Sequence, residues 1–126
     1  HWHFYNVPVS SNSSRRAIDS PLGMLKELSH ERDFVAFKLD IDWPLTEMPI
    51  AASLLRNAED NALVDEFFFE LHFRCEVMMS VGGPGNGCGW GTSIPFEREG
   101  IRLERPNVLI YFRQLRETGI RAHFWP

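Results

Sequence analysis

Two nearly continuous apolar runs stand out in the hydrophobic pattern of this chain, and each of them ends in polar side chains. The first run is Phe34–Leu39, which Asp40 and Asp42 follow, and the second run is Val64–Phe73. Short segments rich in aromatic and β-branched side chains predict strands, and the lack of strict alternation indicates that both faces of each strand are covered. We therefore expect these two runs to be central strands of one sheet.

Apolar residues recur at helical spacing in three other segments, Ser20–Ser29, Leu45–Asn57 and Pro106–Thr118. The first of these opens with a serine before a proline, which is a common start of a helix. In the second, Pro49 fits into the first turn if the helix begins near Thr46. The third helix is predicted to have an apolar face made of Val108, Tyr111, Phe112 and Leu115.

Shorter segments complete the predicted order of elements. His1–Val9 and Ile120–Trp125 are rich enough in apolar and aromatic residues to form strands at the two ends. Met78–Gly91 contains six of the nine glycines, so we expect a long loop there. Strands and helices thus alternate along the chain, which predicts an α/β fold with a mainly parallel sheet and flanking helices.

The composition is that of a chain with a hydrophobic core. With 126 residues, of which 44% are hydrophobic, residues 1–126 are expected to form a single α/β domain. The formal charge of -4 and the absence of a basic stripe argue against a nucleic-acid partner. No apolar run is long enough for a membrane helix and no signal peptide is visible, so localisation stays open. Because the chain starts at His1, we expect that an upstream portion was removed or left out.

The two cysteines, Cys75 and Cys88, do not show the spacing of a zinc site or of a redox motif. A disulfide between them across a flexible loop stays open. Two free thiols are favoured, because disulfides are rare outside oxidising compartments.

Two carboxylates at the end of the first predicted strand are candidates for chemistry. Asp40 and Asp42 are two residues apart, so their side chains point to the same side of an extended chain. Open α/β sheets bind ligands at the carboxyl ends of their strands. The pair could hold a divalent cation or bind hydroxyl groups. The alternative is structural, with Asp42 capping the next helix and Asp40 bonding backbone amides.

The second predicted strand supplies Glu70 and His72 at its corresponding end. A right-handed crossover would bring them near the aspartates. Asp40 and His72 are then candidates for acid–base catalysis, and Asp40, Asp42 and Glu70 are candidate ligands of a metal. An ordinary network of ion pairs and hydrogen bonds at the rim of the sheet remains the alternative.

Three stretches, FKLDID, DEFFFELHF and LRETGIRAHFWP, resemble the C-terminal half of FkbM-like methyltransferases, which are class I S-adenosylmethionine-dependent enzymes. The resemblance implies a Rossmann-like fold in which the strand ending at Asp40 and Asp42 is the fourth of the sheet and borders the cofactor cleft. Lys38 also matches the pattern of that strand, whereas Trp43 replaces the glycine that often follows the second acid. The glycine-rich cofactor loop and the ribose-binding acid have no counterpart here, which implies a fragment of a larger domain.

Three functions follow from these residues. The resemblance implies methyl transfer from S-adenosylmethionine to a hydroxyl of a small molecule or glycan, with Asp40 or His72 orienting or deprotonating the acceptor. The Asp40–Asp42 motif also suits a metal-dependent glycosyltransferase that holds manganese against a nucleotide-sugar diphosphate. The third function is that of a non-catalytic interaction domain with structural acidic groups. The oligomeric state stays open.

Overall fold

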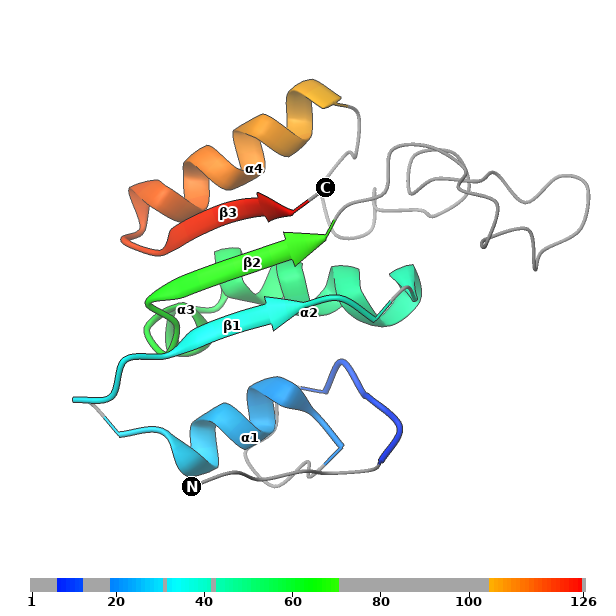
Figure 1. Cartoon of the computed structure of the whole chain (residues 1–126), viewed down its shortest axis with the longest axis vertical. Coiled ribbons are helices and arrows are strands. Elements are labelled where there is room, and N and C mark those ends of the chain that lie inside the picture. Colours follow the sequence, from blue (N-terminus) through cyan, green and yellow to red (C-terminus); the bar gives the residue numbers. More distant parts are fainter. Residues whose placement is uncertain (1–6, 13–18, 31, 42, 71–104, 126) are drawn as a thin grey trace, which may run out of the picture.

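The structure, a computed structural model, combines a three-stranded parallel sheet with helices packed along it (Figure 1). Along the chain, the described elements follow the order helix, strand, helix, short helix, strand, helix, strand. The predicted α/β fold with a mainly parallel sheet and flanking helices is therefore confirmed. The structure describes residues 7–12, 19–30, 32–41, 43–70 and 105–125.

The sheet has the strand order β1-β2-β3, so each strand lies beside its neighbour in sequence. Its members are β1 (Ala36–Leu39), β2 (Glu66–Glu70) and β3 (Arg121–Trp125). All pairs are parallel, with Ala36 opposite Glu66 and Glu66 opposite Arg121. The carboxyl ends of the three strands consequently meet at one edge, which is where parallel sheets of this class bind ligands.

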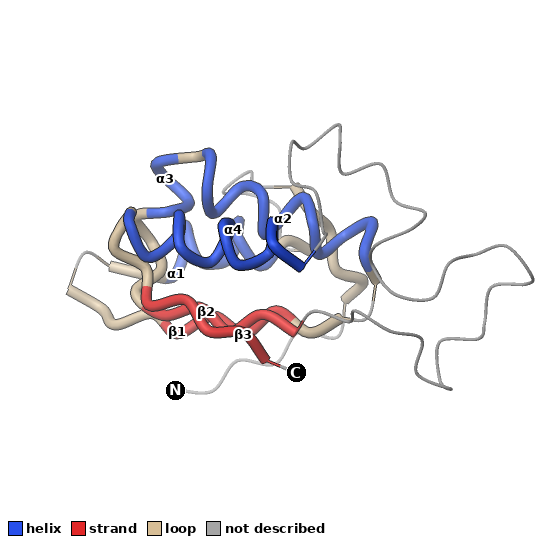
Figure 2. The backbone as a smooth tube through the Cα atoms, turned by 90° about the horizontal axis from the view of Figure 1, so that it is seen from above, coloured by secondary structure: helices blue, strands red, loops and turns tan. Residues whose placement is uncertain are grey.

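The described helices all lie on the same side of the sheet (Figure 2). They are α1 (Pro21–Leu28), α2 (Pro44–Arg56), α3 (Ala58–Asn61) and α4 (Arg105–Glu117). Helices α2 and α3 carry the chain from β1 back to the start of β2, and α4 leads into β3. Because successive side chains of a strand point to opposite faces, every second strand residue is directed toward this helix layer.

The core lies between the helices and the sheet. Phe67 and Phe69 of β2 are fully buried there, with their ring centroids 5.6 Å apart. The predicted apolar face of α4 is confirmed, since each of its members is at most 3% exposed. Burial of such side chains is the main favourable contribution to folding. The other buried apolar residues are Leu22, Leu39, Met48, Ile50, Ala51, Ala52, Leu54, Val64, Ile120 and Ala122.

The opposite face of the sheet is not covered by any described element, and this corrects one prediction. Leu39 is 1% exposed, but its neighbour Lys38 and the first strand residue Ala36 are exposed. The expectation that the Phe34–Leu39 run is covered on both faces is therefore wrong within the described part of the chain. The run lacks alternation because the uncovered face also carries an aromatic side chain, Phe34, over which the Arg121 guanidinium lies at 5.0 Å. We call this surface the open face.

The ends of the helices follow local sequence signals. Ser20 caps α1, and its Oγ accepts a hydrogen bond from the Gly23 N–H at 3.2 Å, as expected for a serine before a helix. Helix α4 is followed by Gly119, whose φ of 104° is a left-handed conformation that favours glycine. Hydrogen bonds from Gly119 and Ile120 back to the last turn of α4 close that end.

The start of α2 differs from the prediction. The helix begins at Pro44 rather than near Thr46, because a proline at the first helical position has its φ preset and needs no hydrogen-bond donor. Pro49 consequently lies inside the helix instead of in its first turn. The missing N–H removes one intrahelical hydrogen bond, while the burial of Met48 and Ile50 on either side of Pro49 favours the helix.

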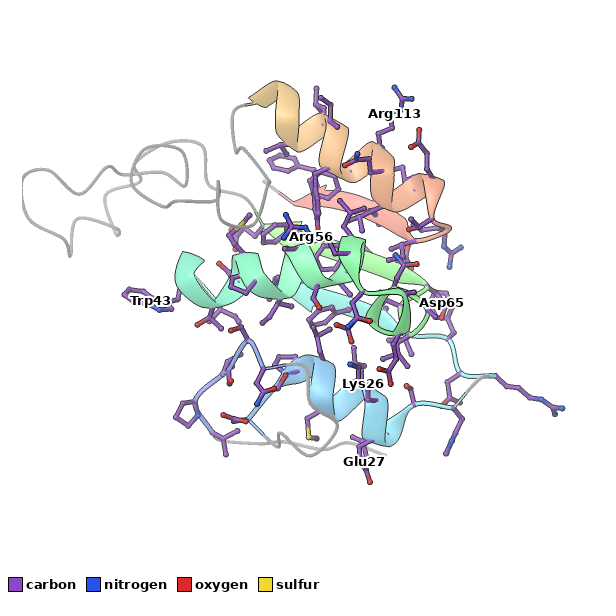
Figure 3. All side chains as sticks on the ribbon, turned by 180° about the vertical axis from the view of Figure 1, so that it is seen from behind. Lys26, Glu27, Trp43, Arg56, Asp65 and Arg113 are labelled. Carbon is purple, nitrogen blue, oxygen red and sulfur yellow. The ribbon has the colours of Figure 1, made fainter. Side chains whose placement is uncertain are left out.

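A buried ion pair that the sequence did not predict joins α1 to α3. Lys26 Nζ lies 2.5 Å from Asp60 Oδ1, and the side chains of these residues are 4% and 0% exposed. Ser53 Oγ of α2 also donates a hydrogen bond to the Asp60 carboxylate. Figure 3 shows Lys26 directed from α1 toward the neighbouring helices, whereas Glu27 points away from them. The contact thus ties three helices together.

Several predictions fall outside the residues that the structure describes. The loop Met78–Gly91 and both cysteines belong to this group, as does most of the predicted strand His1–Val9. Residues 7–9, the described part of that strand, have no regular structure. Among the described helices, none has the length and apolar character needed to cross a membrane.

Candidate functional site

The candidate site lies at the carboxyl edge of the sheet, where β1 and β2 end side by side. Leu39 and Phe69 form the last aligned pair of the two strands, so Asp40 and Glu70 occupy neighbouring positions one residue further on. The right-handed crossover predicted from the sequence accounts for this placement. The structure thus brings together two of the predicted site residues, which are 30 positions apart in sequence.

Lys38 is the third member of this cluster. Its Nζ lies 2.5 Å from Asp40 Oδ2, and the two side chains are 50% and 31% exposed. The hydrogen bond to Asp40 raises the pKa of Lys38 above its ordinary value, partial burial opposes this, and the charges of Asp40 and Glu70 add to the rise. The charges of two carboxylates therefore act on this ammonium group.

The cluster belongs to the open face of the sheet. Lys38 and Glu70 alternate along their strands with Leu39 and Phe69, which are buried beneath the helices. The contact between Lys38 and Asp40 places the Asp40 carboxylate on the same side. An incoming ligand would therefore reach these groups from the side of the sheet without described helices, close to the ends of the strands.

A buried carboxylate lies on the other side of the same strand end. Glu47 of α2 is 0% exposed, and its Oε1 accepts a hydrogen bond from the backbone N–H of Ile41 at 2.6 Å. Sequence reasoning missed this residue, because a glutamate in the first turn of a helix is common and is usually solvent-exposed. The only available signal was its position shortly after the two aspartates.

Trp43 marks the outer end of the loop between β1 and α2. Its side chain is 57% exposed and points outward at the start of α2 (Figure 3). The residue occupies the N-cap position of α2 without a side-chain hydrogen bond to the helix. A polar N-cap residue would normally provide that bond, so the start of α2 must be held in another way.

Further along the open face, β2 and β3 share a second polar cluster. His123 Nε2 lies 2.8 Å from Glu66 Oε1, and Arg121 Nη2 lies 3.9 Å from Glu66 Oε2. The His123 ring stacks on Phe68 with the centroids 4.7 Å apart. These are contacts between directly opposed or diagonal residues of paired strands, which stabilise sheets in general. We assign this cluster to the pairing of β2 with β3.

Two of the predicted site residues, Asp42 and His72, lie outside the described residues. The predicted metal ligands are therefore represented by Asp40 and Glu70 alone. Among the residues that the structure does describe, no group of three or more histidine, cysteine, aspartate or glutamate side chains is arranged to hold a metal ion. What the described cluster offers is two carboxylates that accept hydrogen bonds and one ammonium that donates them.

Comparisons with known proteins identify no relative of this chain. No protein-family model matches the chain, and searches of curated proteins and of solved structures give no significant match. The geometry of the carboxyl edge is therefore the basis on which a function can be proposed.

Proposed function

We propose that this chain forms the acceptor side of an S-adenosylmethionine-dependent methyltransferase that methylates a hydroxyl of a small molecule or glycan. The observation that supports the proposal is the cluster of Lys38, Asp40 and Glu70 at the carboxyl edge of a parallel sheet. Ligands of α/β proteins bind at this edge, and partly exposed carboxylates there can accept hydrogen bonds from an acceptor hydroxyl.

In the proposed reaction, Asp40 orients the hydroxyl of the acceptor and takes up its proton. The Asp40 carboxylate, held by its contact with Lys38 Nζ, accepts the hydrogen bond of the hydroxyl in this proposal. When bound, S-adenosylmethionine supplies an electrophilic methyl group on a sulfonium ion. With that cofactor bound, the acceptor oxygen would take the methyl group as the carbon–sulfur bond breaks, which would leave a methyl ether and S-adenosylhomocysteine. Lys38 holds Asp40 in place throughout.

The charge of the edge fits both reactants. The negative charges of Asp40 and Glu70 favour a cationic sulfonium nearby. It also offers acceptors and a donor for polyhydroxylated molecules. The glycine-rich loop that holds the cofactor in the resembling family has no counterpart in this sequence, and the proposal for this chain therefore concerns the acceptor side of the site.

The proposal is tested on a protein that joins this chain to a cofactor-binding half, by methyl transfer from S-adenosylmethionine labelled with tritium in its methyl group. The acceptors are a panel of methyl glycosides, oligosaccharides and small alcohols, and the product is the labelled ether. We expect Asp40→Asn to lower the rate at least tenfold, because it removes the proton acceptor. The matched control is Asp33→Asn, since Asp33 Oδ2 accepts a hydrogen bond from the exposed His30 N–H and lies away from the cluster.

Two results would contradict the proposal. The first is a protein in which this chain is joined to a cofactor-binding half and which still labels none of the acceptors and gives no heat with S-adenosylmethionine or S-adenosylhomocysteine in titration calorimetry. The second is a transfer rate that Asp40→Asn and Asp33→Asn lower to the same extent, because the effect would then not depend on the carboxyl edge.

A further inference from the structure

We propose that Glu47 is a positioning residue, whose buried carboxylate holds the peptide between Asp40 and Ile41 and so fixes the direction of Asp40 at the carboxyl edge. This role rests on the proposed function for its catalytic consequence. The hydrogen bond from Ile41 and the burial of Glu47 are independent of that function.

The location of Glu47 is costly for a charged group. Its side chain is 0% exposed, and Met48, Ile50 and Ala51, which follow it in α2, are core residues. A buried carboxylate is destabilising unless hydrogen bonds or charges compensate for its lost hydration, and an apolar side chain would avoid this cost. Leucine or methionine at this position would therefore fill the core with less loss of stability. We infer that the carboxylate is present because it accepts a hydrogen bond, which an apolar side chain cannot do.

The carboxylate holds a stretch of backbone that lies beyond the paired residues of β1. The pairing of β1 with β2 ends at Leu39, and Ile41 lies beyond it. Glu47 Oε1 accepts the Ile41 N–H at 2.6 Å, a short distance typical of a hydrogen bond to a charged acceptor. Since the amide N–H of Ile41 belongs to the peptide that follows Asp40, this bond restrains the backbone that carries the Asp40 side chain.

The same contact connects the start of α2 to the end of β1. Trp43 at the N-cap position forms no side-chain hydrogen bond to the helix. In a capping box, a glutamate at the third helical position reaches back to the N-cap backbone. Here Glu47, at the fourth position, reaches further back to Ile41, and the positive end of the α2 dipole favours its negative charge. This hydrogen bond thereby connects the end of β1 to the first turn of α2.

The consequence for the site is a fixed distance between Asp40 and Lys38. Their contact of 2.5 Å requires that Asp40 stay on the open face after the strand has ended. Release of the Ile41 peptide would let the backbone at Asp40 rotate, and the carboxylate would leave both Lys38 and the neighbourhood of Glu70. Small misplacements of a catalytic group lower rates strongly, because catalysis depends on orientation.

We call the hydrogen bond between Glu47 and the Ile41 N–H the clamp. It is tested by nuclear magnetic resonance on the whole chain without any ligand. Glu47→Gln keeps an oxygen acceptor, so we expect the amide exchange of Ile41 and the titration of the Lys38 ammonium to stay close to wild type. Glu47→Leu removes the acceptor, and we expect Ile41 exchange at least tenfold faster and a pKa of Lys38 closer to its ordinary value of 10.5. If Glu47→Leu does not fold, Glu47→Asp, which is too short to reach Ile41, replaces it with the same expectation.

A destabilised core variant separates positioning from general loss of stability. Leu115→Ala leaves a cavity under α4, far along the chain from the clamp. It should change neither the ratio of the Ile41 amide exchange rate to the rates of adjacent residues nor the pKa of Lys38. The proposal is wrong if Glu47→Leu or Glu47→Asp leaves both signals unchanged, or if Leu115→Ala shifts them equally.

Methyl-transfer kinetics then distinguish the clamp from the proposed function. With an acceptor that the wild type methylates, we expect Glu47→Leu to lower kcat at least tenfold with little change in KM for S-adenosylmethionine, and Glu47→Gln to restore most of the rate. If a protein that joins this chain to a cofactor-binding half shows no methyl transfer, the proposed function is overturned, whereas the resonance signals would still decide whether Glu47 holds Asp40. A lowered kcat that Glu47→Gln does not restore would contradict positioning through the hydrogen bond.

Discussion

Tyr111→Phe is expected to change the pH dependence of stability in a way that the structure specifies. The Tyr111 hydroxyl donates a hydrogen bond to the carbonyl oxygen of Ala51 at 2.8 Å and links α4 to α2. The ring packs edge-on against Phe112 with the centroids 5.5 Å apart, and the residue is 3% exposed. Phenylalanine keeps the ring and these packing contacts, so the substitution isolates the hydroxyl.

At neutral pH, the variant should be less stable than the wild type by about 1 kcal/mol. That is the usual net contribution of one intramolecular hydrogen bond between neutral groups. The removal of a hydroxyl leaves little empty volume, so no large cavity contribution is expected in addition.

At alkaline pH, the difference should shrink and then reverse. Burial raises the pKa of Tyr111 well above its ordinary value of 10.0, because the ionised phenolate loses its hydration. A group whose pKa is higher in the folded state contributes constant stability below its unfolded pKa and loses that contribution as pH rises. Above pH 10, the free energy of unfolding of the wild type falls with a slope that approaches about 1.4 kcal/mol per pH unit. At pH 11 the accumulated loss is about 1.4 kcal/mol. The variant lacks this loss, so the two stabilities should become equal at about pH 10.6.

The measurement is urea unfolding of both proteins, followed by circular dichroism at several values between pH 7 and pH 11.5. The comparison of wild type with variant cancels the titration of all other groups, including the second tyrosine of the chain. A stability difference that stays constant from pH 7 to pH 11 would refute the reasoning, since Tyr111 would then titrate alike in the folded and unfolded states.

Two further substitutions test other parts of the fold by urea unfolding. Lys26→Met should destabilise the chain by about 3–5 kcal/mol, because it leaves the buried Asp60 carboxylate without its cation. Lys38→Met breaks a partly exposed ion pair and should destabilise the chain by less than about 1 kcal/mol. Equal effects of the two substitutions would contradict the role assigned to burial. Gly119→Ala should destabilise the chain by about 1 kcal/mol through backbone strain alone, because φ is 104° and no atom lies within 4 Å of the added Cβ. An unchanged midpoint of urea unfolding would show that the end of the helix adapts without strain.

The features that the sequence predicted well depend on local periodicity. The apolar face of α4 and the two phenylalanine-rich strands are visible as spacings of three to four or as apolar runs, and the structure has them where they were expected. The alternation of strands and helices then leaves few arrangements besides a parallel sheet. Asp40 and Glu70 become neighbours for the same topological reason.

The features that the sequence could not predict depend on contacts between distant elements. Lys26 and Glu47 are charged residues on helices, and such residues usually face water. They are buried here because α1 packs next to α3 and because the end of β1 lies over the first turn of α2. The open face was missed for a related reason, since an apolar run does not show which of its residues the helices cover.

The strand order also affects how the chain folds. Ala36 of β1 pairs with Glu66, 30 positions later, while Glu66 of β2 pairs with Arg121, 55 positions later. Closing the longer loop costs more entropy, by about half a kcal/mol for a flexible chain. We therefore expect the unit of β1, α2, α3 and β2 to assemble before β3 docks, so that substitutions in β2 slow folding while substitutions in β3 mainly accelerate unfolding.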